Sequence, residues 1–358
     1  MFHSRFSFLF IYAVVFHFVV PKTDIVAQSF EIGPLSLGNS INHDGVRFNF
    51  RDKDVQNING INVTVWKSSG DNTSTIRGLA FGLPYASAGN LKGAGFGLLA
   101  TVVEQNAKGA VFGGLITVVG ETANASMFSG LVNVIGENGS GLMFTGLMNV
   151  TGEDHKGLQL TGLVNISGQN HRGLQVGGIM NIVGESVNGA QLSGLVNING
   201  ANSKGLRAAG LMNVTGESSK GFDAAILMNI TGQNSKGFAA AGLVNVSGTE
   251  MRGFAAAGLM NVSAHIKGVS VAAANIGVDL SGIHLGALNL TNENKGDLSG
   301  FALAPLNITR YNQSGITVGV FNFAKKLNSK GLQIGLLNVV KSNPRGLRFL
   351  PFFNKDFR

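Results

Sequence analysis

The sequence predicts an all-β protein built from tandem 16-residue repeats, and three observations support this fold class. Apolar and polar residues alternate within each repeat, which is typical of an extended chain. Gly makes up 52 of 358 residues while charged residues make up only 13%, and Gly and β-branched residues are poor helix formers. The third observation is the exact 16-residue interval between the leading glycines of the repeats, which are Gly141, Gly157, Gly173, Gly189, Gly205, Gly221, Gly237 and Gly253.

The first 27 residues are predicted to be a signal peptide that is cleaved before Gln28. Arg5 precedes an apolar run at residues 6–20, and the small residue Ala27 ends the segment. This run is shorter than the roughly 20 residues that a membrane-spanning helix needs. We therefore expect an exported protein in which residues 28–44 form an N-terminal leader before the repeats.

A single β-repeat domain is predicted for residues 45–354, followed by a C-terminal tail at residues 355–358. Weaker copies of the repeat precede the regular array at Gly45, Gly60 and Gly78. Beyond Gly253 the leading glycines continue at intervals of 14 to 18 residues, and Ala125 occupies the one regular slot that lacks glycine. Because one repeat series covers this whole range, no second domain is expected.

Each repeat is predicted to contain two short β-segments joined at a central glycine. In the stretch KGLQLTGLVNISG, residues 156–168, the step from Gly157 to Asn165 is eight residues. In later repeats, such as residues 331–338, the same step is only seven. Losing one residue from a continuous strand would turn every later side chain to the opposite face, so we place a corner or bulge at Gly162.

One asparagine recurs at the same place in nine repeats: Asn133, Asn149, Asn165, Asn181, Asn197, Asn213, Asn229, Asn245 and Asn261. In a parallel β-solenoid, equivalent residues stack about 4.8 Å apart. Each amide can then donate to one neighbour and accept from the other, which satisfies a buried polar group. These residues are therefore predicted to form a structural ladder.

Two other architectures fit the same pattern. One is an antiparallel hairpin array that closes into a shallow barrel, in which equivalent residues do not face one another. The other is an outer-membrane β-barrel, whose strands also alternate apolar and polar residues. Uniformly short turns and a single tryptophan, Trp66, disfavour the membrane barrel, because such barrels carry long loops and aromatic girdles.

No catalytic residues, metal ligands or cofactor site are predicted, so the chain is not expected to be an enzyme. The absence of Cys excludes disulfides, thiolate metal sites and Cys nucleophiles. His155 and His171 lie one repeat apart, but two ligands alone do not make a metal site. We expect both histidines to be solvent-exposed turn residues. No set of nucleophile, base and orienting group is visible.

Basic residues precede the leading glycine in many repeats and form a candidate anion-binding turn column. Its members are Lys156, Arg172, Lys204, Lys220, Lys236 and Arg252. Acidic residues in the same turns, such as Glu153 and Glu217, are expected to offset these charges. Such a column suits anionic glycans or membrane headgroups, whereas the lack of aromatic residues in the turns disfavours nucleic acid.

The C-terminal segment GLQIGLLNVVKSNPRGLRFLPFFN, residues 331–354, resembles a family of bacterial surface-repeat proteins. That family carries tandem GLQIGLxN-type units and an NPxGLRxLPxxN ending. GINVTVW at 60–66 and GLAFGLPY at 78–85 look like its N-terminal units. The resemblance covers about residues 45–354, although the middle departs from it through the eight-residue spacing and alanine-rich runs.

This resemblance implies export and a location at the outer membrane or cell surface of a Gram-negative-type bacterium. The family offers no catalytic residues to transfer to this chain. We therefore expect an exported scaffold of the cell envelope without catalysis, with envelope glycans, lipids or surface proteins as candidate partners. The alternative is a membrane-inserted barrel or a lipid- or glycan-binding β-array.

Overall fold

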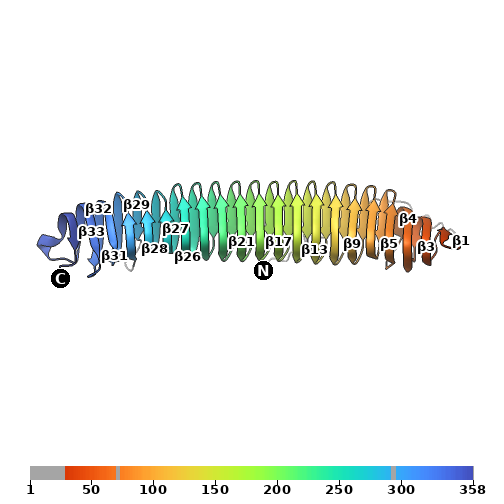
Figure 1. Cartoon of the computed structure of the whole chain (residues 1–358), viewed down its shortest axis with the longest axis horizontal. Helices are drawn as coiled ribbons and strands as arrows, with labels where there is room; N and C mark the ends of the chain where they lie inside the picture. The colour runs from red at the N-terminus through yellow and green to blue at the C-terminus, as the bar shows by residue number, and fades with distance from the viewer. Residues whose placement is uncertain (1–28, 70–72, 292–295, 358) are drawn as a thin grey trace.

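The computed structural model describes residues 29–69, 73–291 and 296–357. The chain forms a parallel β-solenoid of about 18 turns, which confirms the predicted fold class. The coils stack into a long, narrow rod with the first strands at one end and the last strands at the other (Figure 1). The predicted signal peptide, residues 1–27, lies outside the described residues.

The described residues contain 34 strands and one short 3₁₀ helix. In chain order they are β1 (Phe30–Ile32), β2 (Leu35–Leu37), β3 (Asn42–Lys53), β4 (Asn57–Ser69), β5 (Thr75–Gly82), β6 (Tyr85–Ala88), β7 (Asn90–Gly97), β8 (Ala100–Val103), β9 (Ala107–Gly113), β10 (Ile116–Val119), β11 (Ala123–Ser129), β12 (Val132–Ile135), β13 (Gly139–Thr145), β14 (Met148–Thr151), β15 (His155–Thr161), β16 (Val164–Ser167), β17 (His171–Gly177), β18 (Met180–Val183), β19 (Val187–Ser193), β20 (Val196–Asn199), β21 (Ser203–Ala209), β22 (Met212–Thr215), β23 (Ser219–Ala225), β24 (Met228–Thr231), β25 (Asn234–Ala241), β26 (Val244–Ala257), β27 (Met260–Val271), β28 (Ala274–Leu285), β29 (Leu288–Thr291), β30 (Asp297–Leu303), β31 (Leu306–Gln313), β32 (Ile316–Leu327), β33 (Leu332–Val340), η1 (Arg345–Leu347) and β34 (Phe349–Lys355).

A regular coil contains one strand of seven residues and one of four, joined by two corners. In the coil that begins at His155, β15 ends at Thr161 and β16 begins at Val164. The first corner is therefore Gly162–Leu163, which agrees with the corner or bulge predicted at Gly162. The second corner, residues 168–170, carries the polar turn residues.

Neighbouring coils pair in parallel, with each residue beside its counterpart one coil away. Gln159 of β15 pairs with Gln175 of β17, and Asn165 of β16 pairs with Asn181 of β18. This pairing excludes the antiparallel hairpin array. Where the coil length changes, the offset between paired residues changes at a corner, as between Ser247 and Glu250 in the β26–β27 pairing.

Both ends of the rod carry an antiparallel strand. At the N-terminal end β1 pairs antiparallel with β2, which in turn pairs in parallel with β3. At the C-terminal end β34 pairs antiparallel with β33. Such terminal strands cover the unpaired backbone groups of the first and last coils, which would otherwise present open sheet edges.

The leading glycines are required by the close approach of stacked coils. Gly157 has φ of +139°, and a Cβ there would lie 2.1 Å from the carbonyl oxygen of Gly141. No other residue type fits such a contact at this backbone conformation. At Ala125, where the glycine is missing, the β11–β13 pairing skips from Asn124 to Met127.

The interior of the rod is polar along its middle third. Buried apolar clusters span residues 55–143 and 251–302. Between them most inward positions carry amides, hydroxyls and charged groups, with a few buried apolar residues such as Val183 and Val187, while larger apolar side chains alternate to the outside. Gln159 and Asn165 are 0% exposed, whereas Leu163 is 38% exposed. The middle coils therefore reverse the usual arrangement of an apolar inside and a polar outside.

Candidate interaction surfaces

The nine predicted asparagines form one continuous interior column. Asn149 donates through Nδ2 to Oδ1 of Asn165 at 3.0 Å and to the carbonyl oxygen of Leu160 at 2.9 Å. Successive amides from Asn133 to Asn261 are joined at 2.9–3.0 Å in the same way. The column continues through Asn275, Asn289, Asn307, Asn322 and Asn338. These amides are buried and hydrogen-bonded within the protein, so they act in folding rather than in ligand binding.

A second interior column lies beside the first and was missed by the sequence reasoning. Gln175 donates to Gln159 at 2.7 Å, and Gln191 donates to Gln175 at 2.8 Å. In the next two coils the same position holds Arg207 and Asp223, a buried ion pair at 2.7 Å. The sequence does contain a pattern that would have predicted this column, because all five residues stand two positions after a leading glycine.

His155 and His171 are buried, so the prediction that they are exposed turn residues is wrong. They are 2% and 1% exposed, and their rings stack with centroids 5.5 Å apart. Each begins a strand and points inward, because alternate side chains of a strand face opposite sides and the following basic residue points outward. Burial lowers the pKa of His155 to about 4; burial and the neighbouring His155 lower the pKa of His171 to about 3. Within the described residues no three or more His, Asp or Glu side chains gather to hold a metal ion.

The six predicted basic residues lie in one exposed row along the polar edge of the rod. Adjacent coils place Lys156 beside Arg172, and Lys204 beside Lys220. Asn188 stands in the row between Arg172 and Lys204 and so divides the six residues into two groups. The register extends the same row to further basic residues, namely Arg77, Lys92, Lys108 and Lys267. We call these ten residues the basic column.

Most of the central basic column makes no ion pair. In the described part of the chain, Arg252 pairs with Glu250 at 2.8 Å and Lys267 pairs with the same carboxylate at 2.8 Å. The hydrogen bond from Lys267, with help from Arg252, lowers the pKa of Glu250. Among the described contacts, no carboxylate lies within ion-pair distance of Lys156, Arg172, Lys204, Lys220 or Lys236.

The turn carboxylates bind asparagines instead of the basic column. Glu153 accepts a hydrogen bond from Asn138 at 3.0 Å, and Glu217 accepts one from Asn202 at 2.9 Å. Each of these bonds joins the turns of neighbouring coils. Glu153 and Glu217 therefore join neighbouring turns and form no ion pair with the column among the described contacts, so the charge of the central column faces solvent.

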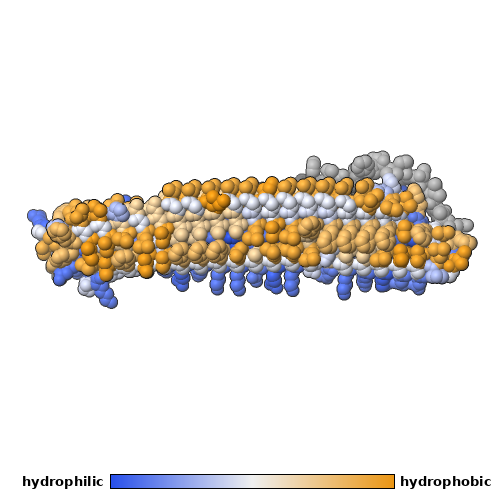
Figure 2. All heavy atoms as spheres, turned by 45° about the horizontal axis from the view of Figure 1, so that its top comes forward, coloured by the Kyte–Doolittle hydropathy of each residue, from blue (hydrophilic) through white to orange (hydrophobic). Residues whose placement is uncertain are grey.

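The opposite edge of the rod is apolar. We call its row of large side chains the Leu ridge: Leu99, Leu115, Leu131, Leu147, Leu163, Ile179, Leu195, Leu211, Leu227, Leu243 and Leu259. Backbone hydrogen bonds, such as that from Leu131 N to Leu115 O at 2.8 Å, hold these residues in line. Figure 2 shows the apolar row at the upper edge and hydrophilic side chains projecting from the lower one.

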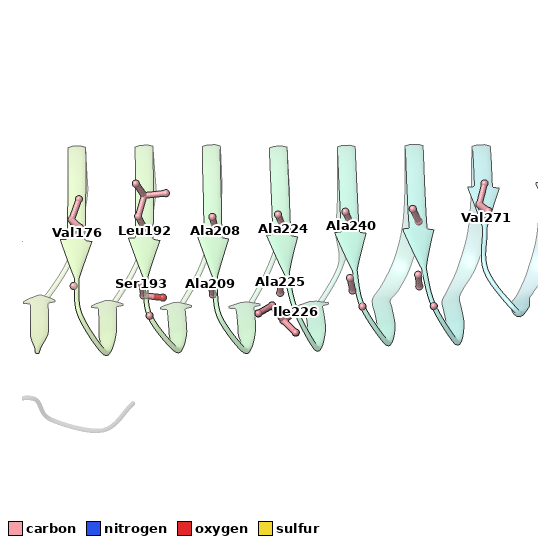
Figure 3. Close-up of a pocket in the computed structure, with 17 residues that line it drawn as sticks. Val176, Leu192, Ser193, Ala208, Ala209, Ala224, Ala225, Ile226, Ala240 and Val271 are labelled. Atoms are coloured by element: carbon pink, nitrogen blue, oxygen red, sulfur yellow. The ribbon is translucent and has the colours of Figure 1, made fainter.

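A row of corner glycines, the Gly ledge, precedes the ridge at every coil from Gly114 to Gly258 except one. In that coil Ile226 replaces glycine and is 66% exposed. A shallow groove of about 830 Å³, the Ala groove, lies beside the ledge (Figure 3). Its floor is formed by Ala208, Ala224, Ala240, Ala256 and the alanines that follow them.

The Ala groove arises because one outward column changes side-chain size along the rod. This column carries Phe144 and Leu160 in earlier coils but alanine in four successive later ones. Val176 and Leu192 line the groove at one end and Val271 lines it at the other (Figure 3). The groove is therefore bounded along the rod axis and lined mainly by apolar atoms.

No family model, curated protein or solved structure matches the chain. Among the described residues, no helix has both the length and the apolar character that crossing a bilayer requires.

Proposed function

We propose that this chain is an exported, non-catalytic scaffold of the cell envelope that binds linear anionic glycans along its basic column. The observation that carries this proposal is the row of exposed cations without ion-pair partners. From Arg77 to Lys267 the glycine-led register places a cation in ten of thirteen coils, the exceptions being Asn124, Ser140 and Asn188, which suits a partner that is itself extended and repetitive.

The electrostatics of the column favour a polyanion. Adjacent cations stand about 4.8 Å apart at their backbones, and two unit charges at about 5 Å in water repel by roughly 0.8 kcal/mol. A polymer with regularly spaced negative charges relieves this repulsion at every coil. Because the column is exposed, its attraction for the polymer decreases as salt is added.

A glycan fits the column better than a membrane surface does. The cations form a single line on one edge, whereas lipid headgroups form a plane. The Leu ridge lies on the other edge, so one bilayer cannot contact both the ridge and the basic column. The basic column therefore meets its partner in water.

The test compares the binding of two five-residue variants to polygalacturonate, a linear uronic acid polymer. In the first, Lys156, Arg172, Lys204, Lys220 and Lys236 are changed to Gln. We expect at least a tenfold loss of affinity at low salt, since each exposed cation contributes on the order of a few tenths of a kcal/mol or more. Titration calorimetry at two salt concentrations measures both the affinity and its salt dependence.

The matched control removes the same charge elsewhere. Arg310, Lys325, Lys326, Lys341 and Lys355 are exposed but lie off the column, and their change to Gln should leave binding within about twofold. Equal losses in both variants would show that only net charge matters and would overturn the proposal. So would tight binding to phosphatidylglycerol vesicles with none to polygalacturonate, because headgroups would then be the partner.

The proposed location is tested separately. The apolar run at residues 6–20 of the predicted signal peptide and the family resemblance of residues 331–354 support export to the envelope. An antibody against the chain should find it in the envelope fraction, and washing at alkaline pH should release it as a peripheral protein. Retention after the wash would identify an integral protein instead.

A further inference from the structure

We propose that the apolar edge pairs with a second copy of this chain, so that the Leu ridge of each copy lies in the Ala groove and on the Gly ledge of the other. This proposal does not depend on glycan binding, because it concerns the opposite edge of the rod. The partner is inferred from the size, charge and repeat spacing of the edge.

The exposed apolar area is close to what a stable dimer requires. Ten of the eleven ridge side chains are 37–51% exposed. At about 120 Å² of apolar surface per leucine, these side chains offer on the order of 500 Å². The ledge and groove beside them add to this area, and a standard interface buries about 800 Å² per partner. Monomers rarely leave so large a continuous apolar strip exposed.

The charge distribution favours a protein partner over a lipid surface. Between residues 93 and 262 every Lys and Arg except the buried Arg207 belongs to the basic column, on the edge away from the ridge. Elements that lie on membranes carry Lys or Arg at the boundary of their apolar face. The ridge has no such flanking cations, so two apolar edges can approach without charge repulsion.

The geometry makes the edge complementary to itself. The ridge residues lie in the corner, immediately before the four-residue strands, and the Ala groove lies before the corner, at the end of the seven-residue strands. A two-fold rotation about an axis along the rod brings each ridge opposite the other groove. Both copies then run in the same direction, and their leucines and alanines repeat at the same spacing of about 4.8 Å.

The experiment measures the mass of the purified protein by sedimentation equilibrium. We expect the wild-type chain to be a dimer. Changing Leu211, Leu243 and Leu259, three exposed ridge residues in the coils of the groove, to Gln should raise the dissociation constant by roughly 100-fold or more, because three apolar contacts are lost in each copy. Unchanged far-UV circular dichroism would show that the solenoid is still formed.

A second variant tests the groove without adding polar groups. Ala224→Leu with Ala240→Leu restores the leucine that this column carries at Leu160 and Leu192, so the coil should accept it. Filling the groove should also give a monomer. The control, Ala190→Leu, adds the same side chain in a column that has Leu174 and Leu206 as neighbours outside the groove, and it should remain a dimer.

A monomeric wild-type chain would overturn the proposal. So would a dimer that survives both the ridge and the groove variants, because another surface would then form the contact. Flotation of the wild-type monomer with neutral phosphatidylcholine vesicles, lost in the ridge variant, would assign the edge to lipid instead.

Discussion

At the scale of single residues, the protein uses side-chain amides as interior cross-links between coils. Asn181 accepts a hydrogen bond from Asn165 and donates to Asn197, each at 2.9 Å. Its second N–H bonds the carbonyl oxygen of Leu192 at 2.8 Å. One side chain thus links three coils, in a place where water cannot replace a missing partner.

Asn181→Ala should lower the free energy of unfolding by roughly 2–5 kcal/mol, because it leaves a buried donor and a buried acceptor without partners. Urea unfolding followed by circular dichroism measures the change. Asn188→Ala is the control: Asn188 is exposed and interrupts the basic column between Arg172 and Lys204, and its loss should change stability by less than about 0.5 kcal/mol. A similar small effect at Asn181 would contradict the importance of the ladder.

The sequence could predict the asparagine ladder but not the orientation of the histidines. Asn165 recurs at a fixed interval inside an apolar stretch, and only stacking explains both facts together. His155 stands next to Lys156 in a segment with turn-like composition, and composition does not show which way a side chain points. The inward position becomes clear only from the register, which places valine or serine there in other coils, such as Val187 and Ser203.

At the scale of the structural element, two neighbouring coils enclose an uncharged histidine pair. No ring nitrogen of His155 or His171 has a hydrogen-bond partner within the described structure. A third buried histidine, His284, also has its pKa lowered by burial to about 4. Nδ1 of His284 lies 2.7 Å from Oγ of Ser270. Protonating any of these rings places a positive charge in the buried interior, which is unfavourable.

The pH dependence of stability follows from the direction of these shifts. The ordinary pKa of histidine is 6.5, and the folded values are about 4 for His155 and about 3 for His171. Below pH 6.5 the unfolded chain binds protons that the folded chain does not, so unfolding becomes more favourable as the pH falls. Stability should be constant above about pH 7 and decrease between pH 6.5 and 4.

A double variant, His155→Leu with His171→Leu, isolates this effect from the titration of carboxylates. The same interior column holds leucine at Leu91 and Leu280, so the substitution suits the site. Urea midpoints measured from pH 8 to pH 4 should fall less steeply in the variant than in the wild type. Identical slopes would mean that the histidines are not buried as neutral rings.

At the scale of the whole molecule, stability depends on contacts between neighbouring coils. Deleting residues 157–172 removes one complete coil, and β13 can then pair with β17 in the same register. Deleting residues 157–164 removes half a coil and places unlike strands side by side. The first variant should fold with nearly unchanged stability, whereas the second should lose cooperative unfolding.

Circular dichroism and thermal melts of the two deletion variants provide the measurement. Equal tolerance of both deletions would argue against stacked coils of fixed length. A third variant that lacks residues 157–188, exactly two coils, serves as a positive control because it also preserves the register.

The overall polarity of the rod could only partly be predicted from the sequence. The alternation of Leu158, Gln159 and Leu160 shows that amides and leucines face opposite sides. It does not show which side is the interior, because an apolar interior is the usual expectation. The structure places Gln159 inside and leaves the Leu ridge outside, and the candidate surfaces follow from this reversal. The Ala groove is likewise visible only when alanines 16 residues apart are brought side by side.

The antiparallel strands at both ends give the rod a fixed length. β1 covers β2 at one end and β34 covers β33 at the other, so the length of the described rod is set by the number of coils between them. Each duplication of 16 residues adds about 4.8 Å and leaves every existing contact unchanged. Duplication or deletion of whole 16-residue units would therefore change the length of the rod in equal steps.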